Sequence, residues 1–376
     1  MRVLIATVTA GAGHLQAVAA VKEAWSLIAP ADHVTQVDVL DHVPKLYRKV
    51  YVDGYVKLIE KAPELWGYIF KKTDNHRLLA KVGRWRGELA RHTYRSFAKL
   101  LRGQQPDIVI STHFLPVEIL AGVQQRHPEF KPFHACVVTD FEAHALWLEH
   151  QVDLYCVAAE ETRQSMVARG LKAERVVTTG IPIAQRFSSA IDAPAVRHRY
   201  GWRDDLPILL VLGGGFGMGP VAEVLEALDQ VTQPFQTVVV AGRNAELRES
   251  LAATDRNHPT DVLGFVTNMH ELMGVAALII SKPGGLTTSE ALALGKPLFI
   301  LNPIPGQEAA NSDYLLERGA AVKVNRVEDV AARVEELLGT GKLKELSKAA
   351  ARLGKPAAAM DVCGAVQQRI QRPVST

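Results

Sequence analysis

Short runs of aliphatic and β-branched residues alternate with longer stretches of helical periodicity along the whole chain. This alternation is typical of parallel sheets, whose strands are buried on both faces and joined by helical crossovers. We predict six strands in each half of the chain, at residues 3–8, 33–39, 107–111, 135–139, 154–157 and 176–178, and at residues 208–212, 237–241, 261–265, 277–281, 297–301 and 321–324. The fold class is therefore α/β, with two doubly wound domains.

Prolines and mixed charges without a clear period mark the boundary between the two halves. We expect a first domain at residues 1–185, a linker at 186–206 and a second domain at 207–345. Residues 346–376 are expected to form terminal helices that pack back towards the first domain. Open parallel sheets bind ligands at the carboxyl ends of their strands, so a ligand is expected in a cleft between the two domains.

The composition is that of a globular protein, since 48% of the 376 residues are hydrophobic and 22% are charged. The cysteines Cys136, Cys156 and Cys363 are far apart and form no CxxC pair, which argues against a disulfide framework or a zinc site and suits a reducing cytosol. Residues 3–21 hold no charged side chain, but the glycines and polar residues at their middle favour a buried strand and a turn over a signal peptide or a membrane span. We therefore expect a cytoplasmic protein without a structural metal.

Basic residues concentrate in one segment, because residues 45–102 hold 15 Lys and Arg against five Asp and Glu, although the whole chain carries only +3. Tyrosine, tryptophan and phenylalanine are interleaved with these charges. This mixture suits an anionic membrane interface or nucleic acid. A solvated helical face on a basic protein explains the charges equally well.

The most informative segment is residues 281–311, in which a strand ends at Ser281, a Pro-Gly-Gly turn follows and a helix begins near Thr287. Outward-facing amides and a helix N-terminus favour a phosphate there, with Lys282, Thr287 and Thr288 as further donors. Glu290, in the first helical turn, could accept hydrogen bonds from a ribose diol. Its spacing from Thr287 is equally that of a capping box, which needs no ligand. Beyond the next strand, Gln307, Glu308 and Asn311 are either sugar-binding groups or ordinary helix-start residues.

Two further glycine clusters follow predicted strands. Residues 213–219 read GGGFGMG and lack the GxGxxG spacing of a dinucleotide fingerprint, so they are a weak nucleotide signal. Residues 9–14 read TAGAGH and place His14 at a strand-to-helix turn, where its imidazole is either a catalytic base or a structural side chain.

Six blocks of the sequence can be taken together: KPGGLTTSEALALGKPLFILNPIPGQEAAN, LGGGFGMG, VAGRN, GFVTNMHELM, GIPIAQRF and GAGH. They resemble the monogalactosyldiacylglycerol synthase and processive diacylglycerol glucosyltransferase group, which belongs with the peptidoglycan N-acetylglucosaminyl transferases in the GT-B superfamily. The resemblance spans essentially the whole chain. It implies two Rossmann-like domains facing across a cleft, a UDP-sugar donor in the second, a lipid acceptor near the first, and inversion at the anomeric carbon without an obligatory metal or other cofactor.

The resemblance also implies roles for single residues. The uracil would lie against Phe265 and Val266 with Met269 nearby, and Glu290 would bind the ribose. The diphosphate would be bound by the turn of Ser281, Lys282, Gly284, Gly285, Leu286, Thr287 and Thr288, with help from Gly214 and Gly215. Arg243 and Asn244 of the VAGRN block would approach the nucleotide. Gln307 and Glu308 would hold the transferred sugar.

On the acceptor side, His14 matches the family's amino-terminal histidine and would be the catalytic base. The block TDFEAHALW makes Asp140 the alternative base and places His144 near the acceptor. Ala12 interrupts the family's more usual GGGH loop, which leaves the phosphate contact of that loop open.

The sequence thus predicts an inverting glycosyltransferase that moves glucose or galactose from a UDP-sugar to diacylglycerol or a glycosyldiacylglycerol. We expect peripheral attachment to the anionic inner face of the cell membrane and no nucleic-acid partner. The membrane residues would be Trp66, Phe70, Lys71, Lys72, Arg84, Trp85 and Arg86. The alternatives are a UDP-sugar 2-epimerase, a polyprenyl-linked sugar transferase and a non-catalytic UDP-sugar sensor.

Overall fold

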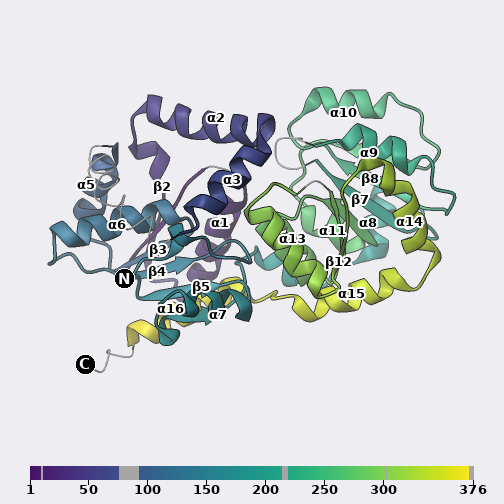
Figure 1. The fold of residues 1–376 in the computed structure, drawn as a ribbon. Helices are drawn as coiled ribbons and strands as arrows, with labels where there is room; N and C mark the ends of the chain where they lie inside the picture. Colours follow the sequence, from purple (N-terminus) through teal and green to yellow (C-terminus); the bar gives the residue numbers. More distant parts are fainter. Residues whose placement is uncertain (10–11, 76–92, 214–218, 302, 372–376) are drawn as a thin grey trace. The chain divides into compact units, whose positions relative to one another are not determined.

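The computed structural model describes residues 1–9, 12–75, 93–213, 219–301 and 303–371. The chain divides into two compact units. Unit 1 comprises Met1–Gln185, Ile304–Gln307 and Ala357–Thr376, and unit 2 comprises Arg186–Pro303 and Glu308–Pro356. Each unit is built on its own six-stranded parallel sheet covered by helices (Figure 1). The predicted α/β fold class is confirmed.

The sheet of unit 1 has the strand order β2-β1-β3-β4-β5-β6, and every neighbouring pair is parallel. Its strands are β1 (Arg2–Thr7), β2 (His33–Asp38), β3 (Ile108–Ser111), β4 (Phe133–Val137), β5 (Leu154–Val157) and β6 (Val176–Thr178). The central strands are buried along almost their whole length, which explains why they are read from the sequence as continuous apolar runs.

Helices cover both faces of this sheet. The helices of unit 1 are α1 (Ala12–Ile28), α2 (Lys45–Lys61), α3 (Pro63–Thr73), α5 (Arg95–Gln104), α6 (Phe114–Arg126), α7 (Glu160–Ala168) and α16 (Ala358–Gln371). On one face, Trp25 of α1 and Val362 of α16 pack in a common core with Ile5 of β1. On the other face, Phe97 of α5 and Leu120 of α6 pack with Leu4. The last helix of the chain, yellow in Figure 1, therefore completes the core of the first unit by packing against α1.

The sheet of unit 2 has the order β12-β11-β10-β7-β8-β9 and is also entirely parallel. Its strands are β7 (Ile208–Leu212), β8 (Gln236–Val240), β9 (Thr260–Leu263), β10 (Leu278–Ser281), β11 (Leu298–Leu301) and β12 (Ala321–Val324). Its helices are α8 (Ala193–Tyr200), α9 (Val221–Leu228), α10 (Ala245–Ala252), α11 (Met269–Val275), α12 (Gly285–Ala293), α13 (Gln307–Glu317), α14 (Val330–Gly339) and α15 (Lys342–Leu353). Leu225 of α9 and Leu337 of α14 pack with Phe299 of β11 in one core.

All twelve predicted strands are present, with ends that differ by at most two residues. Two differences between the predicted and the observed elements change the position of predicted site residues. Strand β4 ends at Val137 and not at residue 139, so Thr139 and Asp140 lie in the loop beyond it. Helix α12 begins at Gly285 and not near Thr287, because Gly284 is its N-cap. In addition, helix α8 lies within the stretch that we expected to be a linker.

The described residues contain no helix that combines the length and the apolar character needed to cross a bilayer.

Candidate active site

The Pro-Gly-Gly turn of unit 2 ends in an uncapped helix N-terminus. Strand β10 ends at Ser281, and Gly284 (φ −62°, ψ 145°) begins α12 without a side-chain hydrogen bond to the first amides of the helix. A Cβ atom added to Gly284 would meet no other heavy atom within 4 Å, so packing does not explain the glycine. A helix N-terminus without a side-chain cap is an arrangement that can bind phosphate groups.

A buried asparagine holds this turn in place. Asn311 of α13 is fully buried, and its Nδ2 donates to the carbonyl oxygen of Pro283 at 3.0 Å. Inside the helix, the Ser289 hydroxyl donates to the Gly285 carbonyl at 2.8 Å. The sequence allowed Asn311 to be a sugar-binding residue, but the structure uses its side chain as a brace between α13 and the turn.

Glu290 lies in the second turn of α12, not in the first. Because Gly284 is the N-cap, Thr287 is already inside the helix, so the capping box between Thr287 and Glu290 does not form. The Glu290 side chain is only 7% exposed. Burial raises the pKa of Glu290 to about 8, although the nearby positive charge of Arg186 acts in the opposite direction. A buried carboxyl group that is not used for capping is a candidate for ligand binding.

The other predicted donor-site residues of this region differ in burial. Ser281, Gly285, Leu286 and Thr288 are buried, whereas Lys282, Gly284 and Thr287 are half-buried. Gln307 and Glu308 begin α13 and are also half-buried. Gly214 and Gly215 lie outside the described residues.

An arginine and an exposed aromatic ring lie together after strands β8 and β9. Phe265 is 63% exposed, and the Arg243 guanidinium lies over its ring at 5.1 Å from the centroid. Val266 and Met269, the first residue of α11, are half-buried. Such an exposed aromatic platform suits stacking against a planar base. Asn244 has a structural role, since its Oδ1 accepts from the Leu247 amide and caps α10.

In unit 1, His14 at the start of α1 is held by the loops after β3 and β4. Its Nδ1 lies 3.0 Å from the Thr112 carbonyl oxygen and 3.2 Å from the Thr139 hydroxyl. A carbonyl oxygen can only accept, so Nδ1 carries the proton and Nε2 keeps its lone pair. Burial lowers the pKa of His14 to about 4, against a smaller raising effect of the Thr112 hydrogen bond. The side chain is therefore a neutral imidazole whose Nε2 can accept a proton.

A second histidine lies against the first. The His113 ring is 4.9 Å from that of His14, edge to face, and its Nδ1 accepts from the Leu115 amide at the start of α6. Burial, and secondarily the charge of His14, lower the pKa of His113 well below its ordinary value. His113 was not among the predicted site residues; the signal in the sequence was a histidine two residues after the predicted strand 107–111.

The other residues predicted on the acceptor side lie in the loop after β4 and on or after α3. Asp140 is half-buried and follows Thr139. His144 is buried, and its Nδ1 accepts from the Leu146 amide at 3.1 Å. Trp66, Phe70, Lys71 and Lys72 lie on α3, whereas Arg84, Trp85 and Arg86 lie outside the described residues.

Helices α2 and α3 expose large apolar side chains beside their lysines. Leu46 and Val50 of α2 and Leu65, Tyr68 and Ile69 of α3 are all exposed, and Lys71 and Lys72 follow them in the last turn of α3. Tyr68 belongs to the aromatic residues that the sequence places among the charges, whereas Leu46, Val50, Leu65 and Ile69 were not predicted to lie on this surface. Apolar side chains next to basic ones are typical of surfaces that contact an anionic bilayer.

Comparison with known families finds one matching family model in each half of the chain. The family model described as monogalactosyldiacylglycerol (MGDG) synthase matches residues 14–183, and the model described as glycosyl transferases group 1 matches residues 192–364. The processive diacylglycerol beta-glucosyltransferase of Bacillus thuringiensis (strain Al Hakam) is 31% identical to the chain over 347 residues, which are 90% of this chain and 85% of that protein.

Solved structures share the fold at lower identity. MurG of Acinetobacter baumannii matches with a TM-score of 0.63 and 17% identity, over 98% of this chain and 99% of that chain. The UDP-GlcNAc 2-epimerase of Neisseria meningitidis, bound to UDP-GlcNAc, matches with a TM-score of 0.58 and 13% identity, over 99% of this chain and the whole of that chain. A glycosyltransferase of Rickettsia africae ESF-5 matches with a TM-score of 0.58 and 12% identity, over 99% of both chains. A glycosyltransferase and an epimerase thus share the architecture, so the fold alone does not select the reaction.

Proposed function

The chain belongs to the monogalactosyldiacylglycerol synthase and processive diacylglycerol glucosyltransferase group of GT-B hexosyltransferases, and on this basis we propose its substrates and mechanism. We propose that it transfers glucose or galactose from a UDP-sugar to diacylglycerol or a glycosyldiacylglycerol, with inversion at the anomeric carbon. The observation that carries the proposal is the buried Glu290 carboxyl group on a helix whose N-terminus is uncapped.

The donor site follows from the chemistry of this helix. The α12 N-terminus provides amides and positive potential for the diphosphate, and Lys282 adds a positive charge beside it. The Glu290 carboxylate accepts hydrogen bonds from the ribose hydroxyls, and the Phe265 ring stacks on the uracil. Gln307 and Glu308 bind the hydroxyls of the transferred sugar.

In the proposed reaction, the acceptor hydroxyl oxygen attacks the anomeric carbon while the bond to the UDP oxygen breaks. His14 Nε2 takes the proton of that hydroxyl, because the Thr112 carbonyl occupies the other ring nitrogen. The negative charge that develops on UDP is stabilised by the amides of the α12 N-terminus. We propose no metal ion for this step, since amides and basic side chains supply the positive potential.

We further propose that the protein reaches its lipid acceptor from the inner face of the cell membrane. The exposed apolar and basic residues of α2 and α3 would insert between anionic headgroups, which provides reversible attachment.

The test combines product identification with one substitution. The protein is incubated with UDP-glucose or UDP-galactose and vesicles containing diacylglycerol, and we expect a glycosyldiacylglycerol product and UDP release only when the lipid is present. His14→Asn retains an amide that can donate to the Thr112 carbonyl but removes Nε2. It should lower turnover on the order of a hundredfold, since a positioned base contributes about 10² to 10⁴, while UDP affinity changes less than about twofold.

Three outcomes would contradict this proposal. Isomerisation of the UDP-sugar without lipid would assign an epimerase, and UDP-sugar binding without any turnover would assign a sensor. Full activity of His14→Asn would exclude His14 as the base and leave Asp140 in that role.

A further inference from the structure

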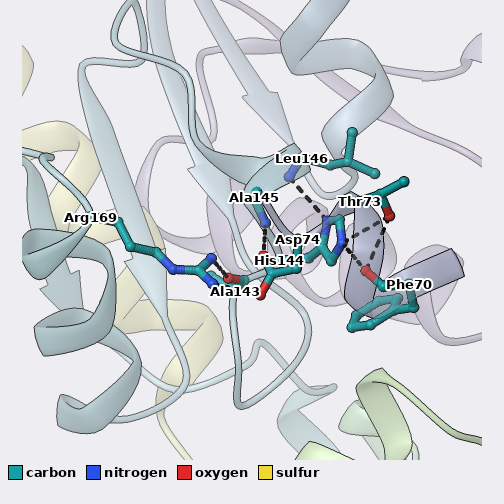
Figure 2. A network of polar contacts seen from close by, with 8 residues as sticks. All are labelled: Phe70, Thr73, Asp74, Ala143, His144, Ala145, Leu146 and Arg169. Atoms are coloured by element: carbon teal, nitrogen blue, oxygen red, sulfur yellow. Dashed lines mark hydrogen bonds and ion pairs between the residues drawn. The ribbon is translucent and has the colours of Figure 1, made fainter. Parts of the chain in front are cut away.

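The carboxyl-terminal end of α3 is joined to the loop after β4 by a network of polar contacts (Figure 2). Helix α3, all of whose residues are described, buries none of them. A helix without a buried side chain depends on other contacts for its position. The contacts in Figure 2 are therefore important for fixing α3.

His144 uses both ring nitrogens in this network. Its Nδ1 accepts from the Leu146 amide at 3.1 Å, and its Nε2 lies 2.9 Å from the Phe70 carbonyl oxygen of α3. An amide can only donate and a carbonyl can only accept, so both contacts require the same neutral tautomer, with the proton on Nε2. The Thr73 hydroxyl also lies 3.3 Å from Nε2. This tautomer has no lone pair left for a substrate proton.

An ion pair reinforces the same junction. The Asp74 carboxylate, which follows α3 directly, accepts from the Ala145 amide at 2.7 Å and pairs with Arg169 at 2.6 Å. The same guanidinium donates to the Ala143 carbonyl at 2.9 Å. The loop thus contacts α3 through His144 and the residue directly after α3 through Ala145. The His144 ring also packs on the Phe70 ring, with centroids 4.4 Å apart.

We propose that His144 is a positioning residue that fixes α3, the helix with the exposed apolar and basic face, to the loop carrying Thr139 and Asp140. This inference rests on the proposed function, in which α3 contacts the membrane and that loop faces the acceptor. It assigns His144 a different role from His14, whose Nε2 is not used by either of its hydrogen bonds. The histidine of one loop holds the lipid-binding helix in place, and the histidine of α1 performs the proton transfer.

Two substitutions test the two hydrogen bonds of the His144 ring separately, the one at Nδ1 and the one at Nε2. His144→Asn places an amide near Nδ1, which preserves an acceptor for the Leu146 amide but loses the contact with the Phe70 carbonyl. His144→Gln extends to the position of Nε2 and can donate to Phe70. Asp74→Asn weakens the pair with Arg169 without touching His144, and His127→Asn, at the end of α6, is the control.

The first measurement is hydrogen exchange of the amides of residues 70–74 in the free protein, without lipid or donor. We expect exchange on the order of tenfold faster in His144→Asn and Asp74→Asn, and rates near those of the parent in His144→Gln and His127→Asn. Unchanged rates in His144→Asn would overturn the proposal, whatever the rates in Asp74→Asn. Because no substrate is present, this result is independent of whether the protein glycosylates lipids.

The second measurement is sugar transfer to diacylglycerol vesicles. We expect His144→Asn to raise the apparent KM for the lipid on the order of tenfold, with UDP affinity and the acidic limb of the pH–rate profile unchanged. A hundredfold loss of kcat with parent-like exchange in residues 70–74 would instead make His144 a catalytic base and overturn the proposal. Absence of transfer by the parent protein would contradict the proposed function, while the exchange experiment would still decide the role of His144.

Discussion

Single hydrogen bonds distinguish residues that look alike in the sequence. His14 and His144 are both histidines of unit 1, yet a carbonyl at Nδ1 leaves Nε2 of His14 basic, whereas an amide at Nδ1 makes Nε2 of His144 a donor. Glu290 and Glu308 likewise both lie near the start of a helix, but Glu290 is buried and Glu308 is half-buried. The chemistry available to each residue follows from these neighbours.

We predict that UDP binding by Glu290 is coupled to proton release. The pKa of about 8 means that most free protein holds a proton on Glu290 at pH 7, whereas ribose hydroxyls donate to the ionised form. UDP affinity should therefore rise between pH 6.5 and 8.5. Glu290→Gln should bind UDP roughly tenfold or more weakly, because hydrogen bonds to a charged acceptor contribute about 1.5 to 3 kcal/mol, and its affinity should not vary over this pH range.

Calorimetry in phosphate and in Tris buffer measures this coupling, because released protons add the buffer's ionisation heat. Glu308→Gln is the control, since it makes the same chemical change at a residue proposed to contact the sugar and not UDP. Equal UDP affinity of the parent at pH 6.5 and 8.5 would contradict the coupling.

The sequence predicted helix α12 but could not decide the role of its glutamate. A Thr-x-x-Glu spacing fits both a capping box and a ligand site, and the choice depends on which residue begins the helix. A tertiary contact helps to set that start, since buried Asn311 of α13 donates to the Pro283 carbonyl. This contact cannot be read from local spacing, whereas the end of β10 at Ser281 was predicted correctly.

At the level of elements, strands were predictable and the surface helices were less so. Parallel strands such as β3 and β10 are buried on both faces, so their apolar runs are unambiguous. Helix α8 lies in a stretch where we expected a linker, because its short sequence shows no strong periodicity. Leu65 and Ile69 of α3 were not predicted to be exposed, because aliphatic residues in a helix are ordinarily assigned to the core.

We predict that Lys71 and Lys72 of α3 contribute directly to membrane binding. Each basic residue near an anionic surface contributes about 1 kcal/mol, so replacing both with glutamine should weaken binding to phosphatidylglycerol vesicles roughly 30-fold. The same change at the exposed Lys344 and Lys348 of α15 is the control and should have little effect. Cosedimentation at increasing salt measures the binding. Equal binding by the parent and the Lys71 and Lys72 variant would show that these residues form only a solvated surface.

At the level of the whole molecule, both units contain titratable groups whose pKa is shifted by burial, downwards for histidines of unit 1 and upwards for Glu290 of unit 2. In unit 1, burial lowers the pKa of His14 to about 4 and that of His134 to about 3, and it also lowers that of His113. In unit 2, burial raises the pKa of Glu290 to about 8. The contributions of these particular groups to the pH dependence of stability should therefore have opposite signs.

The sign follows from the protons bound in each state. Below pH 6.5 the unfolded chain protonates these histidines while the folded unit 1 does not, so unit 1 loses stability as the pH falls from about 6.5 towards 3 to 4. Above pH 4.5 the unfolded chain ionises Glu290 while the folded unit 2 retains the proton, so unit 2 loses stability as the pH rises towards 8. Each pKa unit of difference is worth about 1.4 kcal/mol.

We predict that His134→Gln reduces the acid sensitivity of unit 1. His134 is buried in β4, and its Nε2 lies 2.9 Å from the Ser111 hydroxyl, a contact that a glutamine amide can replace. With a folded pKa of about 3, this histidine alone should remove about 3 kcal/mol of stability between pH 6.5 and 4, and the variant should not show that loss. Urea unfolding followed by tryptophan fluorescence measures it, because four of the five tryptophans lie in unit 1. The exposed His150→Gln variant is the control. If His134→Gln loses as much stability as the parent between pH 6.5 and 4, the acid sensitivity must come from other groups, and His134 must be able to bind a proton without unfolding.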